Sequence, residues 1–222
     1  MATSEVISLL VRSLQPVTPL PVPARRFTRW MALAGVAAIA VVLAVGPRPD
    51  LLDRLTSAPF VAHVVLLLLA ACGSALAALV LAAPGEQLRA PRRAMPVAAA
   101  AAWVSWLSVE LISQASSGGP VWPVIGGWGC MAKAFAVGAA PGLLLVRMVG
   151  RGEPTEVRQA MTFAVLAGTA TGALGVEVTC PVGSPLHLLV WHAGPVLAVV
   201  AAAAVFPGEL LAGARRIARR VP

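Results

Sequence analysis

Two cysteines and two histidines in the second half of the chain could bind metal or change redox state. Cys130 and Cys180 lie 50 residues apart, and His187 and His192 follow shortly after Cys180. Two accessible cysteines in an oxidising compartment tend to form a disulfide. Two thiolates joined by one or both imidazoles can instead bind a soft metal ion, or the cysteines can simply pack. No Cys-x-x-Cys or His-Glu-x-x-His spacing is present, so these three interpretations stay open.

The composition identifies the elements that must position these side chains as membrane-spanning helices. Hydrophobic residues make up 59% of the 222 residues, charged residues only 12%, and the mean hydropathy is +0.85. A soluble domain of this length cannot bury so much apolar surface, whereas a bilayer accepts it on the outside of a helix bundle. Each apolar run is near the ~20 residues that cross about 30 Å of hydrocarbon. We predict an all-α, polytopic membrane protein with six transmembrane helices over 29–46, 60–83, 95–114, 128–149, 158–177 and 186–206.

The basic residues predict the orientation of these helices. Fourteen of the 17 lie in the two terminal segments and in the second-to-third and fourth-to-fifth connections. The other connections hold only Arg48 and Arg54 as basic residues, and two aspartates offset them. Basic residues accumulate on the cytoplasmic side, so we expect both the N-terminus and the C-terminus in the cytoplasm. The net charge of +8 then reflects topology, and we expect no direct binding of nucleic acid.

With this topology, the reactive side chains gather in the outer half of the membrane. Cys130 begins the fourth helix and Cys180 follows the fifth, while His63 and His187 begin the second and sixth. His192 lies about 7–8 Å of helical rise further in. A disulfide, a redox pair or a metal site of Cys130, Cys180, His187 and His192 is compatible with these depths.

Charged residues inside the predicted helices indicate a second class of function. Glu110 and Lys133 lie about one helical turn below the outer ends of the third and fourth helices, and Glu177 lies near the outer end of the fifth. Charges inside a membrane usually find a partner, so we expect an ion pair of Lys133 with Glu110 or with Glu177. The alternative is a small ion or solute transporter that uses Glu110, Lys133 and the outer histidines.

Residues 1–25 are expected to form a separate cytoplasmic unit, followed by a helical membrane domain over 26–222 with a short cytoplasmic tail. Helical periodicity runs over residues 3–15 and places four apolar residues on one face. These residues are Val6, Leu9, Leu10 and Leu14. A proline-rich stretch ends the helix and forms a stiff connector. Such a helix either binds in the groove of a partner protein or lies on the inner leaflet.

Several segments, in order along nearly the whole chain, resemble the NrsF family. They are Glu5-Val6-Ile7-Ser8-Leu9-Leu10, Leu14-Gln15-Pro16-Val17, the pair Arg25-Arg26, Arg48-Pro49-Asp50-Leu51, Cys130, Cys180-Pro181, Ser184-Pro185-Leu186 and Val190-Trp191-His192. The resemblance implies a six-helix, multi-pass anti-sigma factor of the bacterial inner membrane, a negative regulator of an extracytoplasmic-function sigma factor. It also implies that the N-terminal segment holds the sigma factor and that the periplasmic pair Cys130 and Cys180 senses metal or oxidative stress.

The sequence contains no nucleophile–base set and no complete metal-ligand spacing, so we expect a regulator and not an enzyme. The expected partners are the sigma factor and the lipid bilayer. Beyond transient binding of a soft metal at Cys130 and Cys180, we expect no cofactor.

Overall fold

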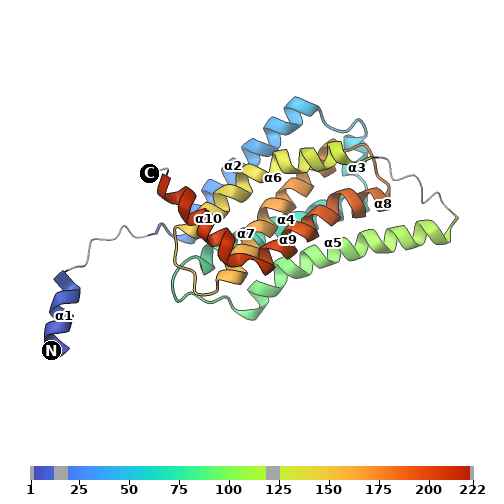
Figure 1. The fold of residues 1–222 in the computed structure, drawn as a ribbon. Coiled ribbons are helices and arrows are strands. Elements are labelled where there is room, and N and C mark those ends of the chain that lie inside the picture. Colours follow the sequence, from blue (N-terminus) through green and yellow to red (C-terminus); the bar gives the residue numbers. More distant parts are fainter. Residues whose placement is uncertain (1–2, 13–19, 119–125, 221–222) are drawn as a thin grey trace.

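All regular elements are helices in the part of the chain that the computed structural model describes, residues 3–12, 20–118 and 126–220 (Figure 1). They are α1 (Thr3–Arg12), α2 (Pro23–Val45), α3 (Leu51–Leu55), α4 (Ala58–Leu81), α5 (Ala90–Ser116), α6 (Trp128–Gly150), α7 (Val157–Thr179), α8 (Pro185–Leu188), η1 (Leu189–Ala193), α9 (Gly194–Val205) and α10 (Pro207–Arg220). Val6, Leu9 and Leu10 belong to α1, whereas Leu14 lies outside the described residues.

Six helices of this described part are long and apolar enough to cross a membrane, which confirms the predicted number. They are α2, α4, α5, α6, α7 and the continuous unit α8–η1–α9, which covers Pro185–Val205. The clearest difference from the predicted spans is at the first helix, where α2 begins at Pro23 and not at residue 29. Proline fits the first turn of a helix because its missing N–H has no helical partner there.

The central helix of the bundle, α7, packs against α4 and α6 (Figure 1). Its glycines Gly168 and Gly172 face Gly138 and Gly142 of α6. A Cβ atom at Gly168 would lie 2.6 Å from the Cα of Gly142, and one at Gly138 would lie 2.5 Å from the carbonyl oxygen of Gly168. Only glycine allows backbones to approach this closely. The small residues of α6 and α7 therefore join these two helices through their backbones.

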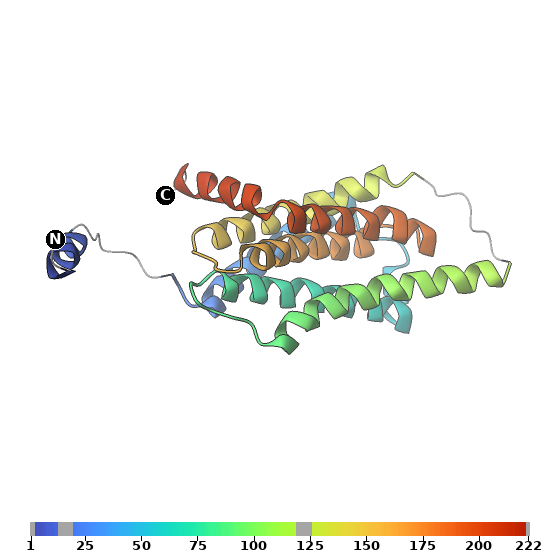
Figure 2. The same ribbon diagram turned by 60° about the horizontal axis from the view of Figure 1, so that its bottom comes forward.

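The connections between the long helices gather at two ends of the bundle (Figures 1 and 2). One end, which we call the cysteine end, holds residues 46–57, 117–118, 126–130 and 180–187. The opposite end, which we call the terminal end, holds residues 20–26, 82–93, 150–157 and 207–220. The Arg-rich connections and the C-terminal segment thus lie at one end of the molecule.

At the terminal end, α10 forms a helix where the sequence pattern predicts only a short tail. Its Leu211 and Ala214 are buried, and α10 packs against α6 and α7. A Cβ atom at Gly150 would lie 2.7 Å from that of Ala214, so the two helices meet closely. Arg215 Nη2 is 2.6 Å from Glu153 Oε2 in the connection between α6 and α7. This connection is therefore covered by both apolar and charged contacts.

Candidate functional site

The C-terminal end of α7 presents backbone carbonyls that no later turn of the helix can satisfy. The amide of Cys180 donates to Val176 O at 2.8 Å. Arg48 donates to the next two carbonyls, with its amide to Val178 O at 2.9 Å and its Nη1 to Glu177 O at 3.5 Å. The helix end that carries Cys180 is thus fixed to the connection between α2 and α4.

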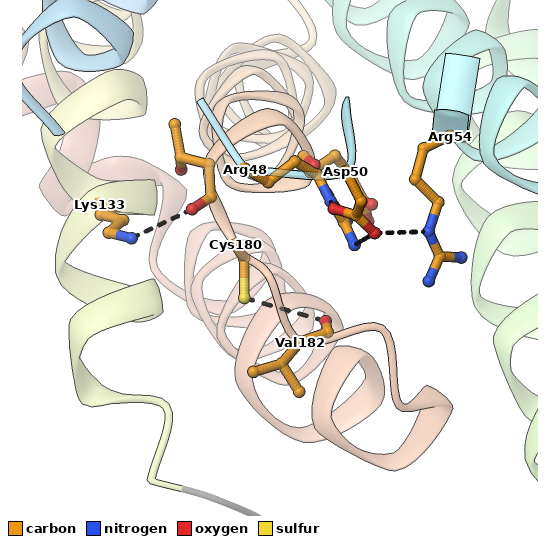
Figure 3. A network of polar contacts seen from close by, with 8 residues as sticks. Arg48, Asp50, Arg54, Lys133, Cys180 and Val182 are labelled. Carbon is orange, nitrogen blue, oxygen red and sulfur yellow. Dashed lines mark hydrogen bonds and ion pairs between the residues drawn. The ribbon is translucent and has the colours of Figure 1, made fainter. Parts of the chain in front are cut away.

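Lys133 completes this cap and does not meet either carboxylate predicted as its partner. Its Nζ donates to Thr179 O at 3.3 Å, across from α6 to α7 (Figure 3). Glu110 instead accepts a hydrogen bond from Trp106 Nε1 at 2.8 Å, and its Oε2 lies 3.7 Å from His63 Nε2. Among the described residues, no ion pair joins Lys133 to either acid. A cation is favoured at the negative end of a helix, which accounts for the position of Lys133.

The two cysteines at this end lie against each other. The Sγ atoms of Cys130, at the start of α6, and Cys180, directly after α7, are 3.0 Å apart. Cys180 Sγ is also 3.6 Å from His187 Nε2. His187 and His192 are both buried, and their rings meet edge to face with centroids 5.4 Å apart. One ligand atom from each of these four residues lies within 4.8 Å of the other three, so the possible metal set named from the sequence is spatially assembled.

A π-helical turn explains how two histidines five residues apart reach the same cluster. In a regular α-helix such residues point about 140° apart. The turn η1 interrupts the helix here, with Gly194 N donating to Leu189 O, and brings His192 back beneath His187. Pro195 cannot donate to the carbonyl four residues before it and its ring crowds that oxygen. The dipeptide Gly194-Pro195 was therefore a sequence signal for the irregular turn.

The surroundings of Cys180 favour its thiolate. Burial opposes ionisation of this thiol, but the neighbouring side chains of His192 and Cys130 outweigh burial, and the pKa of Cys180 lies below its ordinary value. Its Sγ also lies 3.9 Å from the Val182 carbonyl oxygen (Figure 3). The thiolate is the form that binds metals and takes part in thiol–disulfide exchange. Cys180 is therefore suited to either kind of chemistry.

The buried carboxylate of Glu177 lies next to His192 of the cluster. Glu177, one turn before Cys180 on α7, is 2% exposed, and its Oε1 is 3.8 Å from His192 Nδ1. Neither of these two atoms has a hydrogen-bond partner among the described residues. The sequence named Glu177 only as a candidate partner for Lys133, because its proximity to His192 depends on the π-turn.

A cleft of about 630 Å³ opens next to this carboxylate. It is lined by α4, α5, α7, α8 and the connection between α2 and α4. Its charged and imidazole side chains are Arg48, Arg54, His63, Glu110 and Glu177. Glu177 both lines the cleft and contacts His192, so the cleft adjoins the cysteine cluster.

The connection between α2 and α4 folds around Arg48, a role that the sequence did not predict. Asp50 accepts hydrogen bonds from Arg48 Nε at 2.6 Å, from Arg48 Nη2 at 3.1 Å and from Arg54 Nε at 3.1 Å (Figure 3). These bonds, those of Arg48 first, hold the pKa of Asp50 far below its usual range. Arg48 is buried and lies over the Phe60 ring, 5.8 Å from its centroid. The available signal was the spacing of Arg48, Asp50 and Arg54, which puts an aspartate within reach of two arginines in one short connection.

Comparison with known proteins places this architecture in a family of regulators. A family model described as negative regulator of sigma F, NrsF, matches residues 10–212, which is nearly the whole chain. No curated protein and no solved structure gives a significant match. The matched residues include both cysteines of the cluster, both of its histidines and the membrane-length helices. The chain therefore belongs to the NrsF family, the negative regulators of sigma F.

Proposed function

We propose that this multi-pass membrane protein sequesters an extracytoplasmic-function sigma factor through its cytoplasmic N-terminal segment. Metal or oxidative stress in the periplasm then acts on Cys130 and Cys180 and releases the sigma factor at the bacterial inner membrane. Membership of the NrsF family supports the part of this proposal that concerns negative regulation of a sigma factor. The observation that carries the sensing step is the contact of the two sulfurs, 3.0 Å apart, between the ends of two packed helices.

The distance between the sulfurs is compatible with both candidate signals. A disulfide brings two sulfurs to about 2.05 Å, and two thiolates on a tetrahedral zinc-like ion at about 2.3 Å each lie roughly 3.8 Å apart. The 3.0 Å between Cys130 Sγ and Cys180 Sγ lies between these values. Either reaction therefore moves the two sulfurs by about 1 Å or less. Oxidation removes two electrons and two protons from the thiols, and a small-molecule oxidant accepts the electrons.

A soft metal ion fits the donor set as well. Two sulfurs and two imidazoles are the ligands that zinc and related ions prefer. His187 and His192 are buried beside the sulfurs, and His192 Nε2 has no hydrogen-bond partner among the described residues. In this mode Cys130, Cys180, His187 and His192 would hold the ion.

A change at the cysteines can reach the opposite end of the molecule through α6 and α2. Cys130 lies in the first turn of α6, and the far end of α6 contacts the start of α2. There the Arg26 guanidinium donates to Met148 O. Trp30 Nε1 of α2 also donates to Pro141 O of α6, at 3.0 Å. Because α2 follows the N-terminal segment in the chain, a tilt of α6 would move the attachment point of that segment.

The helix α1 is the part of the N-terminal segment best suited to hold the sigma factor. Val6, Leu9 and Leu10 lie in α1, and their helical spacing places them on one face. An amphipathic helix of this kind binds a partner through an apolar groove. Burial of the same face against the sigma factor would keep that protein at the membrane and away from RNA polymerase.

The proposal is tested with cysteine variants of the full chain in cells. We expect Cys130→Ser and Cys180→Ser each to abolish induction of the sigma regulon by metal or oxidant, and the double variant to match either single one. A disulfide contributes roughly 2–4 kcal/mol, enough to move a two-state equilibrium by about one to three decades. Thiol trapping before and after stress measures the state of the pair.

Cys72→Ser is the matched control, because Cys72 lies within α4 with its Sγ 3.7 Å from Met31 Sδ, away from the pair. This variant should induce normally. Full induction in both Cys130→Ser and Cys180→Ser would remove the cysteine pair as the sensor.

A further inference from the structure

We propose that Glu177 is a positioning residue of the cysteine cluster. In this inference, its carboxylate accepts the Nδ1 proton of His192 and directs Nε2 of that ring toward a soft metal ion held by Cys130 and Cys180. The inference rests on the proposed metal-sensing function of the cluster and assigns to Glu177 the selection of the His192 tautomer.

The first support is the burial of the carboxylate. Glu177 lies in α7, a membrane-length helix at the centre of the bundle, and is 2% exposed. An ionisable side chain at such a position is costly unless a partner compensates it. Within the described residues, His192 is the only basic side chain in ion-pair contact with the Glu177 carboxylate. The pair is therefore the compensation that the fold provides.

The second support is the geometry of the ring nitrogens. Glu177 Oε1 lies 3.8 Å from His192 Nδ1, and both atoms lack hydrogen-bond partners in the described structure. A hydrogen bond needs about 2.7–3.2 Å, so a small rotation of either side chain would close the gap. A histidine that binds a metal usually donates its other ring N–H to a carboxylate, which fixes the tautomer and strengthens the ligand. Glu177 is placed for this role.

A comparison with the other carboxylate of the cleft shows that Glu177 differs from a structural acid. Glu110 has a conventional hydrogen bond from Trp106 Nε1 at 2.8 Å, and its side chain is 29% exposed. Glu177 Oε1 has no such bond and faces a residue of the cysteine cluster. A disulfide between the cysteines places no ligand on His192, so the choice of its tautomer does not affect the bond that forms. The role proposed here therefore belongs to metal binding alone.

The test measures metal binding by the purified full chain in lipid nanodiscs under reducing conditions, with Cd²⁺ as the probe. The Cd²⁺–thiolate charge-transfer band reports the bound sulfurs, and competition with a chelator gives the affinity. We expect Glu177→Gln to bind Cd²⁺ about 10–100-fold more weakly than the unmodified chain, with the same band intensity at saturation. Glu110→Gln is the matched control and should bind Cd²⁺ as the unmodified chain does.

A double variant separates positioning from a general structural effect. If Glu177 acts through His192, the combination of Glu177→Gln with His192→Ala should bind Cd²⁺ no more weakly than His192→Ala alone. Additive losses, or an unchanged affinity in Glu177→Gln, would overturn the inference.

A measurement on the unmodified chain keeps the test independent of variant folding. Nitrogen-15 spectra of the histidine-labelled, Cd²⁺-loaded chain should show His192 protonated at Nδ1 and bound through Nε2, and the opposite assignment would refute the inference. The absence of any Cd²⁺–thiolate band in the unmodified chain would also refute it. Sensing by a disulfide would still stand in that case, because thiol trapping measures it separately.

Discussion

At the residue scale, two cations hold the backbone from which Cys180 projects. Lys133 reaches Thr179 O from α6, and Arg48 reaches the two preceding carbonyls from the connection between α2 and α4. The cap joins the helix that begins near Cys130 to the helix that ends before Cys180. A displacement of α6 relative to α7 must therefore strain or break the Lys133 contact.

The capping role of Lys133 predicts the effect of its substitution. Lys133→Met removes the donor to Thr179 O and should lower the free energy of unfolding by about 2 kcal/mol, the usual size for a hydrogen bond with a charged partner. Lys133→Arg keeps a donor and should recover most of the loss. Unfolding of the purified protein in mixed micelles measures both.

A double-mutant cycle distinguishes the capping role of Lys133 from the ion pair with Glu110 that the sequence predicted. If Lys133 acts as a cap, Lys133→Met and Glu110→Gln should have additive effects, because the two side chains have different partners. A coupling energy above about 0.5 kcal/mol would show that the two side chains interact after all.

The sequence was enough to predict how deep each site residue lies along its helix. It was not enough to predict which side chains contact one another. The charge pattern and the helix ends place Cys130, Cys180 and His187 near one depth, and the structure brings them together. The contact between His192 and Glu177 depends on the local geometry of η1. Periodicity cannot supply this contact, since it assumes 3.6 residues in every turn.

At the element scale, we expect the apolar face of α1 to bind the partner protein. Leu10 lies in the middle of this face by helical spacing, and a charge there would be buried without a partner in any apolar groove. We expect Leu10→Asp to weaken sigma binding by several kcal/mol and to make the regulon constitutively active. Pull-down of the sigma factor from detergent extract and a regulon reporter measure the two effects.

Ser8→Asp is the matched control for this variant, since Ser8 is exposed on the opposite side of α1 by helical spacing. It should repress as the unmodified chain does. Unchanged repression in Leu10→Asp would assign α1 to the membrane surface and not to partner binding.

The long helices were predictable because a bilayer demands about 20 apolar residues in each span, a signal that depends on no tertiary contact. The helix α10 was not, because its turn of apolar residues is short and lies among arginines. Its position depends on Leu211 and Ala214 packing against α6 and α7, and on Glu153 opposite Arg215. Such contacts between distant segments leave no local pattern.

At the scale of the whole molecule, the Arg-rich segments share the terminal end, and the cysteine pair lies at the other (Figures 1 and 2). The charge pattern then predicts one topology. Reporter fusions after Arg93 and after Arg151 should report the cytoplasm, and a fusion after Ser117 should report the periplasm. The reversed pattern would place the cysteines in a reducing compartment and contradict the sensing mechanism.

Communication between the two ends is expected to depend on Arg26. This residue is buried at the terminal end, where it donates to Met148 O of α6 and, at 3.5 Å, to Leu79 O of α4. Its guanidinium therefore links the helix that follows the N-terminal segment to the helix that begins near Cys130. In Arg26→Ala, Cys130 and Cys180 should still respond to metal or oxidant, but the start of α2 should no longer move together with α6.

We therefore expect Arg26→Ala to reduce the induction ratio of the sigma regulon toward one, although thiol trapping of Cys130 and Cys180 gives the same result as in the unmodified chain. Arg29→Ala is the matched control, because Arg29 lies one turn later on α2 with an exposed side chain. It removes the same charge but no link between helices, so it should leave induction intact. Normal induction in Arg26→Ala would show that the signal reaches the N-terminal segment by another route, of which the contact between α10 and the α6–α7 connection is the next to test.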